Sequence, residues 1–166
     1  GDITLRGGNV SISSAVTSTG SGKRISIVSD TVSLSANVSA TNSSRVEISP
    51  RTSGRNIVLG VASTSALSIP AAANTFLNAT TLQLGSATAG NISIEASTTF
   101  ASAKVTNLKF VTPGNVTAVS GAVLTVANLA IDAGGNVNLP GSNSVAGNVA
   151  ISASASVTYS SAVSYS

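Results

Sequence analysis

Residues that could carry chemistry are few and widely separated in this sequence. The acidic residues are Asp2, Asp30, Glu47, Glu95 and Asp132. The two carboxyl groups of a glycoside hydrolase lie within about 5–10 Å of each other. Asp2 and Asp30 are 28 residues apart, a poor match to the repeat of about 22 residues described below, and Glu47 has Arg45 beside it as an ordinary surface partner. We therefore expect no catalytic carboxylate pair.

The residue types that are missing exclude other classes of site. The chain has neither histidine nor cysteine, so a Ser-His-Asp arrangement, an imidazole metal site, a thiol nucleophile and a disulfide framework are all excluded. The segment TGSGKR at 19–24 resembles a phosphate-binding loop, but Thr17 occupies the position of its first glycine and Arg24 that of its final Ser or Thr. We interpret it as a surface turn, and we expect no catalytic residue, metal or cofactor.

The net charge also gives little support to nucleic-acid binding. The formal charge is only +3 despite a pI near 9.8. The densest basic group is Arg45, Arg51 and Arg55, and Glu47 lies within it. Nucleic-acid surfaces cluster basic residues with stacking aromatics, so we expect no nucleic-acid partner.

The composition is that of a folded protein with a small, uncharged polar surface. Hydrophobic residues make up 42% of the chain, aromatic residues 3% and charged residues 8%, against about a quarter charged in typical globular proteins. No apolar run reaches the roughly 20 residues of a membrane-spanning helix. The chain opens without a signal peptide and stops within its own pattern, so we interpret it as a mature fragment or an excerpt of a longer protein.

Strand-like phrases recur along the chain in two columns. Ile3 and Leu5 return as Ile25 and Ile27, and again as Val46 and Ile48, at spacings of 22 and 21 residues. A second column follows the first by seven residues, or by eleven in the third turn. With their later counterparts, the expected inward residues are Ile3, Leu5, Val10, Ile12, Ile25, Ile27, Val32, Leu34, Val46, Ile48, Ile57, Leu59, Leu82, Leu84, Ile92 and Ile94.

Two columns with one shared spacing predict a coil of short parallel strands, since hairpins would need a turn signal every 8–12 residues. We expect an all-β fold, a right-handed parallel β-helix (β-solenoid) with 21–25 residues per turn and roughly eight turns. Residues 1–166 form a single segment in this interpretation. The exception is a possible irregular excursion over 61–80, where SIPAAANTFLNATTL could form a helical turn.

Glycine followed by asparagine marks the expected corners. We expect these glycines to allow positive φ, and the asparagines to tolerate left-handed geometry and to hydrogen-bond to the asparagine of the next turn. The expected corner and ladder residues are Gly8, Asn9, Asn56, Gly90, Asn91, Gly114, Asn115, Gly135, Asn136, Gly147 and Asn148.

The phrases VEISPRTSGRNIVLG, TLQLGSATAGNISIEA and LTVANLAIDAGGNVNLPGSNSVAGNVAISAS resemble repeats of filamentous haemagglutinin-type proteins. The resemblance covers nearly the whole chain. These proteins are large bacterial exoproteins, usually exported by two-partner secretion. The resemblance implies a right-handed β-helix filament at the extracellular bacterial surface, with an outer-membrane secretion partner and a role in adhesion, aggregation or biofilm. It supplies no catalytic residue.

Three functions remain open at this level. The favoured one is a structural fibre whose terminal turns pair end to end with the next repeat or subunit, because unpaired strand edges invite pairing. The alternative is an adhesin module that binds a glycan or host protein through loops at 61–80 or 97–107. A polysaccharide-acting enzyme is less favoured.

Overall fold

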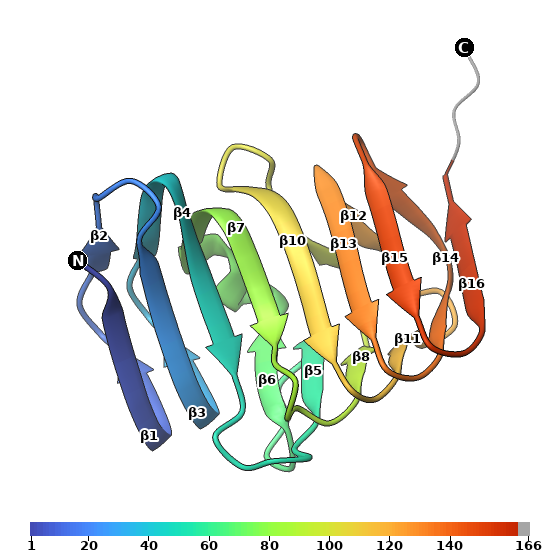
Figure 1. Ribbon diagram of the computed structural model, residues 1–166, viewed down its shortest axis with the longest axis horizontal. Helices are drawn as coiled ribbons and strands as arrows, with labels where there is room; N and C mark the ends of the chain where they lie inside the picture. Colours follow the sequence, from blue (N-terminus) through green and yellow to red (C-terminus); the bar gives the residue numbers. More distant parts are fainter. Residues whose placement is uncertain (163–166) are drawn as a thin grey trace.

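The strands of this protein stack on one another in parallel and form a β-solenoid. The structure is a computed structural model that describes residues 1–162, with 60% strand and 4% helix. Figure 1 shows successive turns side by side along the long axis, from β1 at one end to β15 and β16 at the other. The described strands are β1 (Ile3–Ile12), β2 (Val16–Ser18), β3 (Arg24–Leu34), β4 (Val38–Ser49), β5 (Ile57–Gly60), β6 (Leu67–Pro70), β7 (Leu77–Gly85), β8 (Ile92–Ile94), β9 (Thr98–Thr99), β10 (Val105–Thr112), β11 (Val116–Ala118), β12 (Leu124–Val126), β13 (Asn128–Ala133), β14 (Val137–Val145), β15 (Val149–Ala153) and β16 (Val157–Ser161).

The first face of the coil is a sheet with the strand order β1-β3-β4-β7-β10-β13-β15. Its register keeps like residues above like residues, because Val, Ile and Leu point inward at every second position. One inward column runs Ile3, Ile25, Val46, Leu82, Leu108, Leu129 and Val149. The first-column repeats seen in the sequence are therefore direct partners in the sheet.

A second sheet has the order β6-β5-β8-β11-β14-β12-β9. Its strands β8, β11 and β14 each begin directly after a G-N dipeptide, and Ile92, Val116 and Val137 stand in one column. The long strand β14 turns a corner, since its first part pairs with β11 and its last part with β12. The β9–β12 portion thus forms a third face of the later turns.

The coil has about seven turns in residues 1–162, one fewer than the sequence predicted. The reason is the length of one turn. Ile48 pairs with Leu84, 36 residues further along the chain, whereas Leu108 pairs with Leu129 at a distance of 21 residues. The extra residues of this long turn form structure on its flank and do not make a further turn of the coil.

The expected excursion at 61–80 contains ordered structure. Strand β6 pairs in parallel with β5, so Ile57 lies beside Leu67 only ten residues later. A 3-10 helix, η1 (Ala71–Phe76), follows directly and leads into β7. No helix within residues 1–162 is long and apolar enough to cross a membrane.

The interior holds all sixteen residues expected to point inward. Twelve are buried, and Ile3, Leu5, Val10 and Val32 are partly buried against the same core. Ile3, Leu5 and Val10 lie on β1, the end strand of its sheet. Val32 lies on the part of β3 whose register pairs it with β1, while β4 pairs only with the earlier part. A strand covered on one side leaves its inward side chains half open to water.

Candidate functional site

One corner of the solenoid carries a chain of side-chain amides, here called the first amide ladder: Asn56, Asn91, Asn115 and Asn136. Each Oδ1 accepts the backbone N–H of the asparagine in the next turn, at 2.9, 2.8 and 2.7 Å in order. The ladder ends at Ser156, whose N–H and hydroxyl both donate to the Oδ1 of Asn136, at 3.1 and 2.7 Å. The side chains thus link successive turns in one direction.

The ladder supplies acceptors where the backbone bends. At Asn91, Asn115 and Asn136 the backbone oxygen accepts the N–H of a strand residue in the preceding turn, as Asn115 O does from Ile92 at 2.9 Å. The asparagine N–H faces the same preceding turn, where a side-chain oxygen of the ladder, and not a backbone oxygen, accepts it. Because a backbone N–H without an acceptor is costly, the ladder keeps the corner bonded without a continuous strand.

The glycine before each asparagine has a steric role that differs from the expected one. A β-carbon on Gly90, Gly114 or Gly135 would lie 2.4, 2.5 or 2.2 Å from the Oδ1 of the ladder asparagine in the preceding turn. The expectation of positive φ at these glycines is wrong, since the described glycines with positive φ are Gly22, Gly54, Gly60, Gly85 and Gly121. The left-handed asparagine expected at the corners is also absent from the first ladder; in residues 1–162 the positive-φ residues other than glycine are Asn42 and Ser43.

Asn148, one of the expected corner and ladder residues, belongs to a different corner from the first amide ladder. Its N–H donates to Asn128 Oδ1 at 2.8 Å, and Asn128 Nδ2 donates to Thr106 O at 3.1 Å. Asn128 and Asn148 form a second amide ladder, with Asn107 beside Asn128 in the register. Gly147 repeats the steric rule, because its β-carbon would lie 2.4 Å from Asn128 Oδ1.

Gly8 and Asn9 have the G-N sequence but stand outside both ladders. Asn9 pairs with Thr31 in the first sheet. A β-carbon on Gly8 would meet only the end of the Arg51 side chain, at 4.0 Å. The G-N dipeptide therefore specifies a ladder only where an asparagine occupies the stacked position in the preceding turn.

Asn143 is a polar corner residue that the sequence interpretation missed. It is fully buried on β14, where the strand passes from the second face to the third. Its Nδ2 donates to the oxygens of Leu139, Gly141 and Ser160 at 3.1, 2.9 and 2.9 Å, and its Oδ1 accepts the Leu124 N–H at 3.0 Å. One side chain thus joins three turns.

The acidic residues lie apart, and two of them belong to one charged cluster on the first turns. Arg24 lies between Asp2 and Glu47, with nitrogen–oxygen distances of 4.0 and 3.6 Å, and Arg45 lies 2.7 Å from Glu47. The Arg45–Glu47 pair is the surface pair expected from the sequence. Residues 19–23 of the TGSGKR segment form the turn between β2 and β3, and Arg24 begins β3.

Asp30 is held by the turn that follows β4. Its carboxylate accepts the N–H groups of Arg51 and Thr52 at 3.1 and 2.8 Å and the Thr52 hydroxyl at 2.7 Å. Arg55 donates to the Asp30 backbone oxygen at 3.1 Å. The hydrogen bonds from Thr52 chiefly, with the nearby Arg55 charge, lower the pKa of Asp30 from its ordinary value, against a smaller opposing effect of burial.

The remaining acids, Glu95 and Asp132, are exposed. Within residues 1–162 no three acidic, histidine or cysteine side chains gather in a group that could hold a metal ion.

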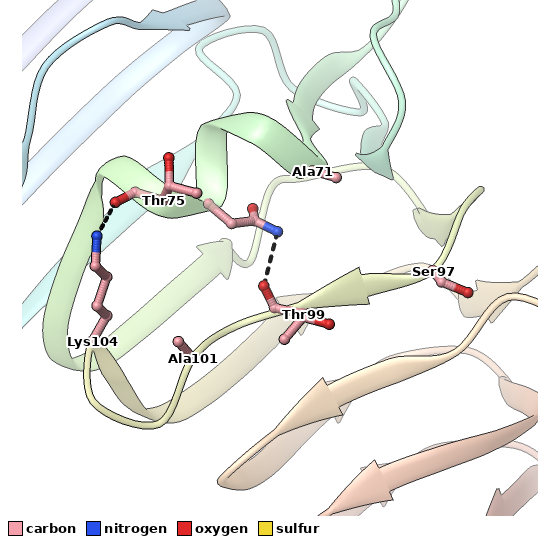
Figure 2. Close-up of a pocket in the computed structure, with 7 residues that line it drawn as sticks. Ala71, Thr75, Ser97, Thr99, Ala101 and Lys104 are labelled. Carbon is pink, nitrogen blue, oxygen red and sulfur yellow. Dashed lines mark hydrogen bonds between the residues drawn. The ribbon is translucent and has the colours of Figure 1, made fainter.

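A pocket opens on the flank where the long turn meets the next one, here called the flank pocket. It has a volume of about 380 Å³ and is lined by Ala71, Asn74, Thr75, Ser97, Thr99, Ala101 and Lys104. Figure 2 shows Lys104 and Ser97 at opposite ends, with Thr99 between them on the floor and η1 above. The walls come from the two loop regions, 61–80 and 97–107, that the sequence singled out for binding.

Two of the polar side chains that line this pocket are those of Asn74 and Lys104. Asn74 is 6% exposed; its Nδ2 donates to Thr99 O at 3.4 Å, and its Oδ1 has no hydrogen-bond partner among the described residues. The Lys104 ammonium donates to the Thr75 backbone oxygen from the exposed side, as the dashed line in Figure 2 shows.

Comparison with known proteins adds no relative to this description. No family model matches the chain, and neither a curated protein nor a solved structure does. The amide ladders and the flank pocket are therefore interpreted from their own geometry.

Proposed function

We propose that this chain is a structural segment of an extracellular bacterial fibre of the filamentous haemagglutinin type, serving adhesion, cell aggregation or matrix formation. The resemblance of its repeats supports the family and the location, including export through an outer-membrane partner. The observation that carries the proposal is the turn-to-turn bonding, in which apolar columns run through the stack of turns and amide ladders join the later turns.

This bonding makes a stiff rod without a conventional globular core. Each turn buries its Val, Ile and Leu side chains only against its neighbours, so stability accumulates with the number of turns. At about 4.8 Å per turn, the described coil is about 30 Å long. The outer surface is rich in small uncharged polar groups, which keeps such a rod hydrated, and the unpaired strand edges face the ends of the stack.

The last described turn presents the features of a stacking surface. Val149 and Val157 are 40% and 50% exposed, although their partners Leu129 and Val137 in the preceding turn are buried. The N–H groups of Leu129 and Val137 donate to the oxygens of Asn148 and Ser156 in the last turn. By the same register, the N–H groups of Val149 and Val157 point onward, toward another turn of this chain or of a second copy.

Electron microscopy and fibre diffraction of the purified chain test this proposal. We expect concentration-dependent fibres with an axial spacing of about 4.8 Å. Replacing both Val149 and Val157 by lysine should abolish the fibres, because a charged side chain on a strand edge blocks pairing.

The matched control is Val119→Lys, since Val119 is 41% exposed but lies in a middle turn. This variant should assemble like the parent chain. Monomers at high concentration for the parent chain, or fibres from the double lysine variant, would contradict the proposal.

A further inference from the structure

We propose that the flank pocket binds a hydroxylated sugar carboxylate of the uronic acid type. This inference goes beyond the fibre role and does not depend on it, because every lining residue belongs to one side of two adjacent turns. The pocket combines an unused buried acceptor, a cationic group at the rim and a floor of short side chains.

The acceptor is Asn74 Oδ1. A 3-10 helix places residues i and i+3 on the same side, so Ala71 and Asn74 of η1 both face the pocket. The Asn74 amide is anchored by its Nδ2 on Thr99 O, which leaves its buried Oδ1 without a partner among residues 1–162. A buried acceptor of this kind favours a donor from a ligand, and a sugar hydroxyl is such a donor.

The cation is Lys104. A tight turn fixes its backbone, with the N–H groups of Lys104 and Val105 both donating to Ala101 O, at 2.8 and 2.9 Å. An ammonium has three donors, and the bond to Thr75 O uses one of them. The remaining donors at the rim suit a carboxylate, because charge-assisted hydrogen bonds are roughly twice as strong as neutral ones.

The rest of the lining suits one flat, partly apolar ring. Ala71 and Ala101 present methyl groups, and Ser97 and Thr99 add short polar side chains. The volume of about 380 Å³ lies at the lower end of the range for small-molecule sites. Lys104 and Ser97 at opposite ends of the pocket (Figure 2) allow a carboxylate at one end of the ligand and hydroxyls along it.

Three probes separate the contribution of the ligand carboxylate to binding from that of the ligand hydroxyls. Each probe is titrated by ligand-observed NMR on the whole chain. Methyl glucuronide carries both the carboxylate and the hydroxyls, methyl glucoside only the hydroxyls, and acetate only the carboxylate. We expect the glucuronide to bind at least tenfold more tightly than either of the other two. Binding should be the same in dilute monomer and in assembled fibre, so that failure of assembly and failure of binding are read separately.

Lys104→Gln should reduce glucuronide affinity at least tenfold and bring it to that of the glucoside, and Asn74→Ala should weaken both sugars. The control is Lys23→Gln, which removes one positive charge from the distant turn between β2 and β3 and should leave binding unchanged. Circular dichroism reports whether each variant is folded; if Asn74→Ala is not, Lys104→Gln alone decides. Equal binding of glucuronide and glucoside, unchanged affinity in Lys104→Gln, or lack of glucuronide binding by the parent chain would overturn the proposal.

Discussion

A β-carbon on Gly114 would lie 2.5 Å from the Oδ1 of Asn91, the oxygen that also accepts the N–H of Asn115 at 2.8 Å. The glycine and the asparagine of one phrase thus have separate roles toward the preceding turn. The glycine leaves room for the amide, and the asparagine N–H donates to it. Within the two ladders, the G-N dipeptide marks a position where an asparagine of the preceding turn lies directly below.

Gly114→Ala should therefore destabilise the fold. The added carbon must displace the Asn91 amide, and overpacking of this kind costs about 1–3 kcal/mol. Urea unfolding followed by circular dichroism measures the change. Gly8→Ala is the matched control, because Gly8 also precedes an asparagine but has open space around it; its change should stay within about 0.5 kcal/mol. Equal losses for the two variants would argue against the steric role of Gly114.

The effects of substitutions at Gly114 and Asn91 on the free energy of unfolding should also be coupled. Asn91→Ala removes the Oδ1, and the next contacts of a Gly114 β-carbon are then at 3.3 and 3.4 Å. The double variant Asn91→Ala with Gly114→Ala should lose less stability than the sum of the single losses, with a coupling of about 0.5–3 kcal/mol typical of residues in contact. Additive losses in this double-mutant cycle would show that alanine at 114 acts independently of the amide.

The stacking was predictable because its signal is repeated. Ile25 and Val46 follow Ile3 at nearly constant spacing, and each inward residue carries the same information as its partner in the next turn. The number of turns was harder to predict from the sequence. The sequence of β6 alternates like any other strand, and only its pairing with β5, ten residues away, shows that it adds to a turn instead of starting one.

The corners were only partly predictable, for a physical reason. Glycine is compatible with both positive φ and close approach, and the sequence alone does not distinguish the two at Gly114. The second ladder did leave a signal that was missed, since Asn107, Asn128 and Asn148 each precede an alternating apolar phrase and are spaced by 21 and 20 residues. Asn74 and Lys104 had no such signal, because the part of the long turn that brings both to the flank pocket does not repeat along the chain.

Asn143→Ala should cost more than the loss of any exposed asparagine. It removes the acceptor of the Leu124 N–H and the donor to three backbone oxygens at a fully buried site. Unsatisfied buried groups cost about 1–3 kcal/mol each, so we expect a loss at or above that range in thermal or urea unfolding. Asn138→Ala, at an exposed position on the same strand, is the control and should change stability little. A loss no larger than that of the control would mean that water replaces the Asn143 bonds.

Acid should weaken the anchoring of the turn at 51–55 through Asp30. Its pKa is lowered in the folded chain by the Thr52 hydrogen bonds first and by Arg55 and Arg51 as well. A lowered folded pKa means that the stabilisation is complete above the unfolded value near 3.8 and is lost as the pH falls through the folded value. The difference in unfolding free energy between the parent chain and Asp30→Asn should therefore be largest above about pH 5 and shrink steadily toward pH 2.

Urea unfolding across this pH range measures that difference. The control is Asp132→Asn, which also loses one carboxylate but at an exposed site. A difference that stays constant from pH 5 to pH 2 would show that the Asp30 carboxylate is not held by the turn, because only the charged form accepts all three bonds from Arg51 and Thr52.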